Sequence, residues 1–192
     1  MKKEKLQELI DLAEVHGFFD DFKKESDRSL VLMSAAILED LLEQRLRKIF
    51  NRGNSDVRRK LFEFNGPFSS FSAKIETLFC IGDLEARFRN DLHILRRLRN
   101  ECAHNWNSFQ LNSNIDIEFM SKMEVNSVAK EIIELIDKHD GREVRRSSRT
   151  TLMVMIMILT HTLNCTPQIT IVQHDKKDQI LKPIESNSPA PS

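Results

Sequence analysis

The sequence predicts an all-α protein, a bundle of about six helices followed by a C-terminal extension of uncertain structure. The first observation is that apolar residues recur at spacings of three and four from residue 3 to about residue 140, as they do on one face of an α-helix. The second is that glycine and other turn-forming residues stand where these periodic segments end. The third is the length of 192 residues, which suits one globular domain with a tail.

The first half of the chain is expected to begin with a helix over about residues 3–17 that ends at Gly17. The main helix is expected from about Asp27 to Phe50, with Ser26 as its cap and Gly53 as its stop. Its apolar residues step by three or four along one face: Val31, Ala35, Leu38, Leu42, Leu46 and Ile49.

Further helices follow, separated by turn signals. The tripeptide Asn65-Gly66-Pro67 breaks the chain after the first of them, and Gly82 ends the second. Residues 105–117 are rich in Asn and Ser and are expected to form a loop. The helices are expected over about residues 55–64, 70–81, 84–104 and 119–139.

The composition changes after Gly141, which predicts three regions: a helical domain (1–141), a basic and apolar extension (142–182) and a disordered tail (183–192). The extension contains the apolar run Leu152–Leu159, whose spacing does not distinguish a helix from a strand. This run is too short to cross a bilayer, so we expect no membrane association.

Composition and charge exclude several classes of protein. Lys and Arg together number 29, as do Asp and Glu, so the net charge is zero and any nucleic-acid binding must use a local basic patch. The three cysteines lie far apart without a CxxC pair, which is typical of reduced thiols and predicts a cytoplasmic location. The sequence contains neither a nucleotide-binding glycine loop nor two pairs of metal ligands, so we expect no cofactor and no metal.

The expected helix over residues 84–104 carries the most chemically interesting side chains. On a wheel of about 100° per residue, Arg99 falls about 40° from Leu95, inside the arc of apolar residues that should face the core. Burying a guanidinium without a partner costs several kcal/mol, so Arg99 needs a nearby anion or an opening onto a cleft. An ion pair with Asp91 or Asp27 would satisfy it structurally, and a bound phosphate is the functional alternative.

Three helical segments lie in order along the chain: SDRSLVLMSAAILEDLLEQRL at 26–46, LFEFNGPFSSFSAKIETLFCIGDL at 61–84 and DLHILRRLRNECAHNW at 91–106. Together they resemble the mannitol operon repressor family of small bacterial helical proteins, over about residues 6–138. Cys102 departs from the family pattern, which usually has a bulky residue there. The resemblance implies a regulatory function and offers no counterpart for the segment after residue 141.

A shorter pattern lies in the last of these segments, where Arg99 and Asn100 are followed by His104. It is similar to the Arg-x4-His motif of the HEPN superfamily, whose members are helical, commonly dimeric, and include metal-independent endoribonucleases and toxins. The resemblance implies that Arg99 holds an RNA phosphate, that His104 acts as acid or base, and that Asn100 orients the imidazole or contacts the substrate. Because Arg99 and His104 diverge by about 140° on a straight helix, this catalytic interpretation requires a helix end near Ala103 or a site shared by two subunits. We therefore expect a homodimer.

Other basic residues are candidates for contacts to a nucleic-acid backbone. Arg96 and Arg97 precede Arg99 on the same helix, and a cluster of arginines opens the extension. A solvated basic linker is the alternative interpretation of this cluster. The cluster consists of Arg142, Arg145, Arg146 and Arg149.

Three functional hypotheses remain open. The first is a regulator of the mannitol operon repressor type with an RNA-binding or endoribonuclease site at Arg99 and His104, and with RNA and a regulatory or antitoxin protein as partners. The alternative is a non-catalytic transcriptional repressor or adaptor that acts through protein–protein interaction, because the sequence contains no recognisable helix-turn-helix, zinc finger or basic zipper. The third is a helical dimerisation module in which Arg99 is only structural.

Overall fold

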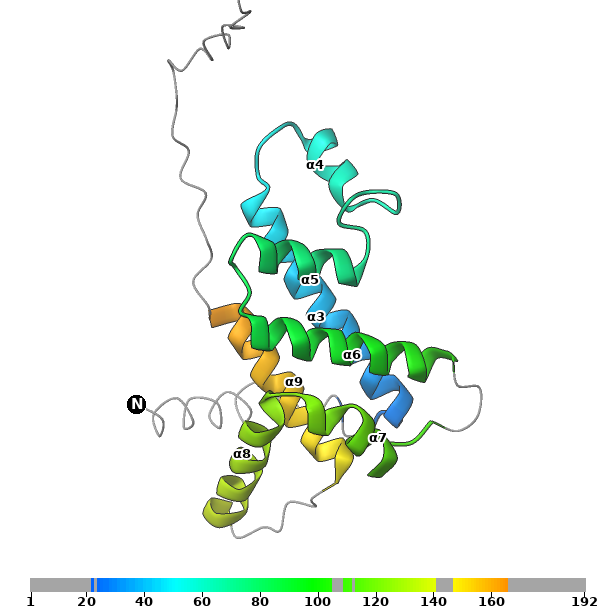
Figure 1. The fold of residues 1–192 in the computed structure, drawn as a ribbon, viewed down its shortest axis with the longest axis vertical. Helices are drawn as coiled ribbons and strands as arrows, with labels where there is room; N and C mark the ends of the chain where they lie inside the picture. Colours follow the sequence, from blue (N-terminus) through cyan, green and yellow to red (C-terminus); the bar gives the residue numbers. More distant parts are fainter. Residues whose placement is uncertain (1–21, 23, 105–108, 112, 141–146, 166–192) are drawn as a thin grey trace, which may run out of the picture.

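The computed structural model describes residues 22, 24–104, 109–111, 113–140 and 147–165 (Figure 1). All regular secondary structure among these residues is helical, which confirms the predicted all-α class. No helix in this part of the chain is both long enough and apolar enough to cross a membrane. The helices are α3 (Asp27–Ile49), α4 (Ser55–Phe62), α5 (Phe71–Cys80), α6 (Ala86–His104), α7 (Ser113–Glu118), the 3₁₀ helix η1 (Met120–Lys122), α8 (Val125–Asp140) and α9 (Ser148–Cys165).

The central helix α3 packs against α5, α6 and α9, and its predicted apolar stripe is buried. Ser26 caps the helix as predicted, because its side-chain oxygen accepts the backbone N–H of Ser29 at 3.1 Å. The helix ends at Ile49, one residue before the predicted end. Gly53 lies in the turn that follows, with a φ of +87° that favours glycine.

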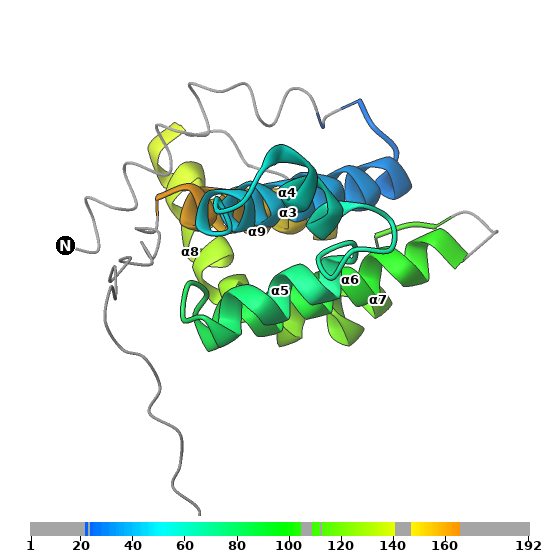
Figure 2. The same cartoon turned by 90° about the horizontal axis from the view of Figure 1, so that it is seen from above.

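The helices form two layers, with α3 and α9 in one and α5 and α6 in the other (Figure 2). Ser70 caps α5 by accepting the backbone N–H of Ala73 at 3.1 Å. α6 contributes Leu92, Leu95 and Leu98 to the core between the layers, each with no exposed surface.

The segment between α6 and α8 differs from the prediction. The loop expected over residues 105–117 contains all of α7 except its last residue, Glu118. The helix expected over residues 119–139 is replaced by η1 and by α8, which begins only at Val125. The late start of α8 is explained by the buried side chain of Asp91 on α6. Its carboxylate accepts the backbone N–H of Glu124 at 2.8 Å and that of Val125 at 3.1 Å. These two bonds satisfy amide groups at the start of α8 and thereby set where it begins.

The apolar run Leu152–Leu159 is helical, which decides a question that the sequence leaves open. Every residue of the run is buried, and α9 packs against both α3 and α8 in the same hydrophobic core. A helix that is apolar on all sides has no amphipathic period, which explains why its spacing was uninformative. The bundle therefore continues beyond the boundary predicted at residue 141, through Cys165. The predicted tail, residues 183–192, lies outside the described residues.

Candidate functional site

The side chains expected to process RNA lie in the last two turns of α6. Arg99 and His104 are exposed, Asn100 is half-buried, and Nη1 of Arg99 donates a hydrogen bond to Oδ1 of Asn100 at 3.3 Å. The expectation that Arg99 faces the core is therefore wrong. Leu92 lies on nearly the same side of α6 two turns earlier and is fully buried. Neighbouring helices therefore cover this side in the middle of α6 but leave it exposed near the end of the helix.

Neither carboxylate expected to pair with Arg99 does so among the described residues. Asp91 binds the start of α8. Asp27 accepts one bond from Nη1 of Arg149 at 2.6 Å and another from the backbone N–H of Leu111 at 2.9 Å. The guanidinium of Arg99 therefore faces solvent beside an amide side chain and is not held by an acidic residue of this part of the chain.

The position of Arg99 and His104 on one helix bears on whether a single chain can use both at one substrate. α6 ends at His104 and so includes both residues, whose positions on a regular helix are about 140° apart around the axis. The RNA-processing role of Arg99, Asn100 and His104 stays a prediction, as does the homodimer that it requires.

The other basic residues predicted to contact nucleic acid lie in different surroundings. Arg97 is exposed, whereas Arg96 is half-buried and its Nε has no hydrogen-bond partner among the described residues. Nη2 of Arg149 donates to the carbonyl oxygens of Phe22 at 2.5 Å and Glu25 at 2.6 Å, and Nη1 donates to the carboxylate of Asp27. Contacts within the chain therefore occupy this guanidinium and join α9 to the residues before α3. Arg142, Arg145 and Arg146 lie outside the described residues.

A second basic surface, which the sequence prediction missed, lies at the opposite end of the long axis from α8 (Figure 1). Residues 47–62, here called the basic tip, contain six basic residues and a single acidic residue, Asp56. All six basic residues are exposed. The signal was present in the sequence as a local excess of positive charge in a chain of zero net charge. The six residues are Arg47, Lys48, Arg52, Arg58, Arg59 and Lys60.

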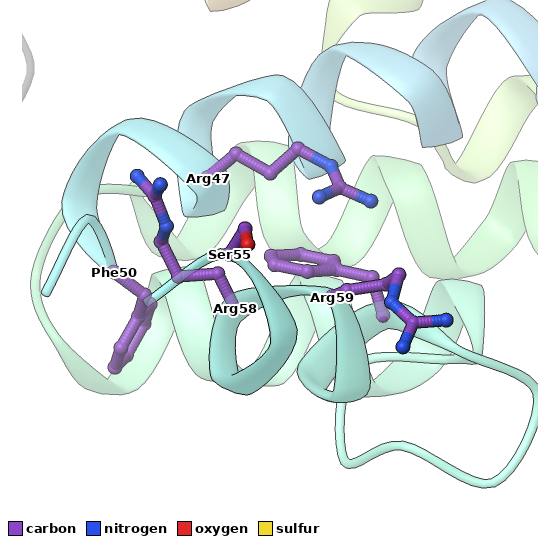
Figure 3. Close-up of a pocket in the computed structure, with 6 residues that line it drawn as sticks. Arg47, Phe50, Ser55, Arg58 and Arg59 are labelled. Atoms are coloured by element: carbon purple, nitrogen blue, oxygen red, sulfur yellow. The ribbon is translucent and has the colours of Figure 1, made fainter. Parts of the chain in front are cut away.

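A cavity of about 290 Å³ opens in the basic tip between the end of α3 and α4 (Figure 3). The guanidinium carbon of Arg47 lies 4.0 Å from the centroid of the Phe62 ring, in a cation–π contact. Phe62 in turn packs against Phe68, with ring centroids 5.4 Å apart, so the wall of the cavity is anchored to a buried side chain. The lining residues are Arg47, Phe50, Ser55, Arg58, Arg59 and Phe62.

Acidic side chains neutralise part of this surface. Arg47 forms an ion pair with Glu43 at 2.7 Å, and Glu43 also pairs with the buried Lys74 at 2.9 Å. Burial alone would raise the pKa of Glu43, but the hydrogen bonds and charges of Lys74 and Arg47 outweigh burial and hold this pKa below its usual value. Glu43 is therefore a stable anion that fixes the guanidinium of Arg47 at the edge of the cavity.

The described residues offer little for metal or thiol chemistry. No three side chains of His, Cys, Asp or Glu among them are grouped closely enough to hold a metal ion. His161 and Cys165 form a pair at the end of α9, with Nδ1 3.5 Å from Sγ. Burial raises the pKa of the Cys102 thiol, which disfavours the thiolate needed for nucleophilic attack.

Two comparisons with known proteins agree with each other. A family model described as "Mannitol repressor" (MtlR) matches residues 22–183, so the match includes α9 and the segment for which the sequence resemblance offered no counterpart. Among solved structures, the chain is similar to a chain of the "X-ray structure of the MtlR-HPr complex from Escherichia coli". The TM-score is 0.58 at 15% sequence identity, and the likeness covers 73% of this chain and 92% of that chain. Among curated proteins, none matches the sequence.

Proposed function

The chain belongs to the mannitol repressor family, and we propose that it is a non-catalytic regulator of transcription that acts by binding a protein partner. The observation that carries this proposal is the extent of the family match, which spans every described helix from α3 to α9. The regulatory role is therefore assigned to the bundle as a whole and not to one segment of it.

The geometry of α6 supports the non-catalytic part of the proposal. Metal-independent cleavage of RNA needs a phosphate-binding group and a proton-transferring group at the same substrate. The positions of Arg99 and His104 on α6 are about 140° apart around the helix axis, which argues against one chain presenting both groups to one phosphate.

HPr is the partner that we propose to test first, because the similar solved structure is a complex of MtlR with HPr. The test is isothermal titration of HPr from the same organism into the full chain, with gel filtration of the mixture as a second measurement. We expect a saturable heat and co-elution of the two proteins. Arg99→Ala and His104→Ala should bind HPr as the wild-type chain does. Absence of both heat and co-elution would contradict HPr as the partner.

The RNA-processing alternative has one observation in its favour, namely that Arg99 and His104 are exposed and so accessible to a substrate held between two subunits. It predicts that the full chain is a dimer that cleaves RNA in EDTA, and that Arg99→Ala and His104→Ala each abolish cleavage while the dimer persists. Arg87→Ala, an exposed arginine in the first turn of the same helix, is the control. Cleavage with this dependence would overturn the non-catalytic proposal, and an intact RNA substrate with all four proteins would support it.

A further inference from the structure

We propose that the cavity of the basic tip binds a small phosphate monoester that carries a planar ring. This site is separate from the α6 residues discussed above and does not depend on the protein partner proposed for the chain. Three features of the cavity favour such a ligand: the charge of its lining residues, its aromatic walls and its size.

Arg58 supplies an available positive charge. Its neighbour Arg59 pairs with Asp56 at 3.3 Å and with Glu63 at 2.9 Å. Arg58 has no carboxylate partner among the described residues, and its Nη1 reaches only the carbonyl oxygen of Asn51, at 3.5 Å, which is at the long limit of a hydrogen bond. Most N–H groups of this guanidinium are therefore available to donate hydrogen bonds to the oxygens of an anion.

Ser55 adds a neutral donor beside this charge. It is the first residue of α4, and the side chain of the preceding Asn54 already accepts the backbone N–H of Val57 at 2.9 Å. In Figure 3 the side chain of Ser55 lies between those of Arg47 and Arg58. A phosphate has three terminal oxygens and up to two negative charges, so it can accept bonds from a hydroxyl and from a guanidinium at once.

The aromatic residues favour a ligand with a flat ring. Phe50 and Phe62 are both half-buried and line the cavity, and each ring packs against Phe68, with centroids 5.0 Å and 5.4 Å away. These contacts hold the two rings in place while part of each stays open to the cavity. A planar group gains stacking energy on the part of such a ring that stays open.

The cavity volume of about 290 Å³ gives room for part or all of a small molecule. Binding pockets for small molecules usually enclose about 300–1,000 Å³, so this cavity is near the lower end. A mononucleotide or an aryl phosphate combines the ring, the charge and the size that these observations require.

The first experiment titrates four probes into the full chain at low salt and measures the heat of binding. The probes are AMP, phenyl phosphate, inorganic phosphate and adenosine. We expect AMP and phenyl phosphate to bind, inorganic phosphate to bind about tenfold more weakly because it lacks a stacking ring, and adenosine not to bind because it lacks the charge. Inorganic phosphate that binds as tightly as AMP would overturn the aromatic part of the proposal, and no binding of any probe would overturn all of it.

The second experiment compares Arg58→Gln with the matched control Arg52→Gln. Both arginines are exposed in the basic tip, but only Arg58 lines the cavity. We expect Arg58→Gln to weaken AMP binding by about tenfold or more, as expected for the loss of a charged hydrogen bond. Arg52→Gln, compared at about 0.15 M salt, should change it by less than about twofold, because the charge of an exposed residue that does not line the cavity is then largely screened. Thermal unfolding at the same temperature for both variants would show that the fold is retained.

Two results of this comparison would overturn the proposal. Equal weakening by both variants would indicate a diffuse charge effect and no built site. Binding of a single-stranded RNA oligomer that depends on Arg58, without binding of AMP, would assign the surface to a nucleic-acid backbone and not to a small ligand.

Discussion

Arg45 and Asp83 form an ion pair that is sealed inside the bundle. Nε of Arg45 lies 2.7 Å from Oδ2 of Asp83, and the two side chains are 4% and 0% exposed. Nη1 of the same guanidinium donates to the carbonyl oxygen of Leu163 at 2.5 Å. One side chain of α3 therefore binds both the turn before α6 and the last turns of α9.

Arg45→Met should lower the free energy of unfolding by about 3–5 kcal/mol, because it leaves the Asp83 carboxylate buried without its partner. The double variant Arg45→Met/Asp83→Leu should lose much less, since neither charge of this pair then remains buried. Urea unfolding of the wild-type chain and both variants measures this difference. A loss below about 1 kcal/mol in the single variant would show that the buried pair contributes little.

Asp91 should make stability depend on pH. Burial raises the pKa of Asp91 above its ordinary value of 3.8, although the backbone N–H groups of Glu124 and Val125 act in the opposite direction. The folded protein then binds this proton more tightly than the unfolded chain. This tighter proton binding stabilises the folded protein below pH 3.8. The stabilisation is lost as the pH rises from there through the raised pKa of Asp91 in the folded state.

Asp91→Asn removes this titration and serves as the comparison. We expect the unfolding free energy of the wild-type chain minus that of Asp91→Asn to fall as the pH rises from about 3.5 towards 7. Urea unfolding at several pH values measures it, and a difference that is constant or rises with pH would contradict the prediction. Asp91→Ala, which removes both bonds to the start of α8, should cost about 1–2 kcal/mol.

Arg149 is expected to stabilise the fold and not to bind nucleic acid. Its guanidinium bonds Asp27 and the carbonyl oxygens of Phe22 and Glu25, so Arg149→Gln should lower the free energy of unfolding by about 1.5–3 kcal/mol. The exposed Arg97→Gln is the control and should change it by less than about 0.5 kcal/mol. Unchanged stability in Arg149→Gln, together with weaker binding to an RNA oligomer, would restore the nucleic-acid role.

Gly66 should tolerate no side chain in the turn between α4 and α5. A Cβ at this position would lie 2.4 Å from the carbonyl oxygen of Lys60 and 2.6 Å from that of Leu61, and both are backbone atoms. Gly66→Ala should therefore lower the free energy of unfolding by about 1–3 kcal/mol and speed amide exchange in α4. The exposed Ser69→Ala, in the same turn, should do neither. Equal exchange rates in Gly66→Ala and the wild-type chain would contradict the prediction.

Local patterns in the sequence predicted the helices whose boundaries depend on nearby residues. The apolar stripe of α3, its Ser26 cap and the turn at Asn65-Gly66-Pro67 each depend on residues a few positions apart. The family resemblance also came from contiguous segments, and the family match confirms it. For the candidate site, the pairing of Arg99 with His104 stays a prediction from the motif. A helical wheel does not show where neighbouring helices end, and so it placed the exposed Arg99 towards the core.

Contacts between residues distant in sequence determined the other features of the fold and of the candidate site. α8 begins at Val125 because a carboxylate on α6 meets its amide groups. The run Leu152–Leu159 of α9 is buried on all sides in a core to which α3 and α8 also contribute. The ion pair of Arg45 with Asp83 and the cavity of the basic tip likewise exist only once helices have packed together. Helical periodicity records which face of a segment is apolar, whereas burial of a charge or the opening of a cavity depends on what the completed bundle places beside it.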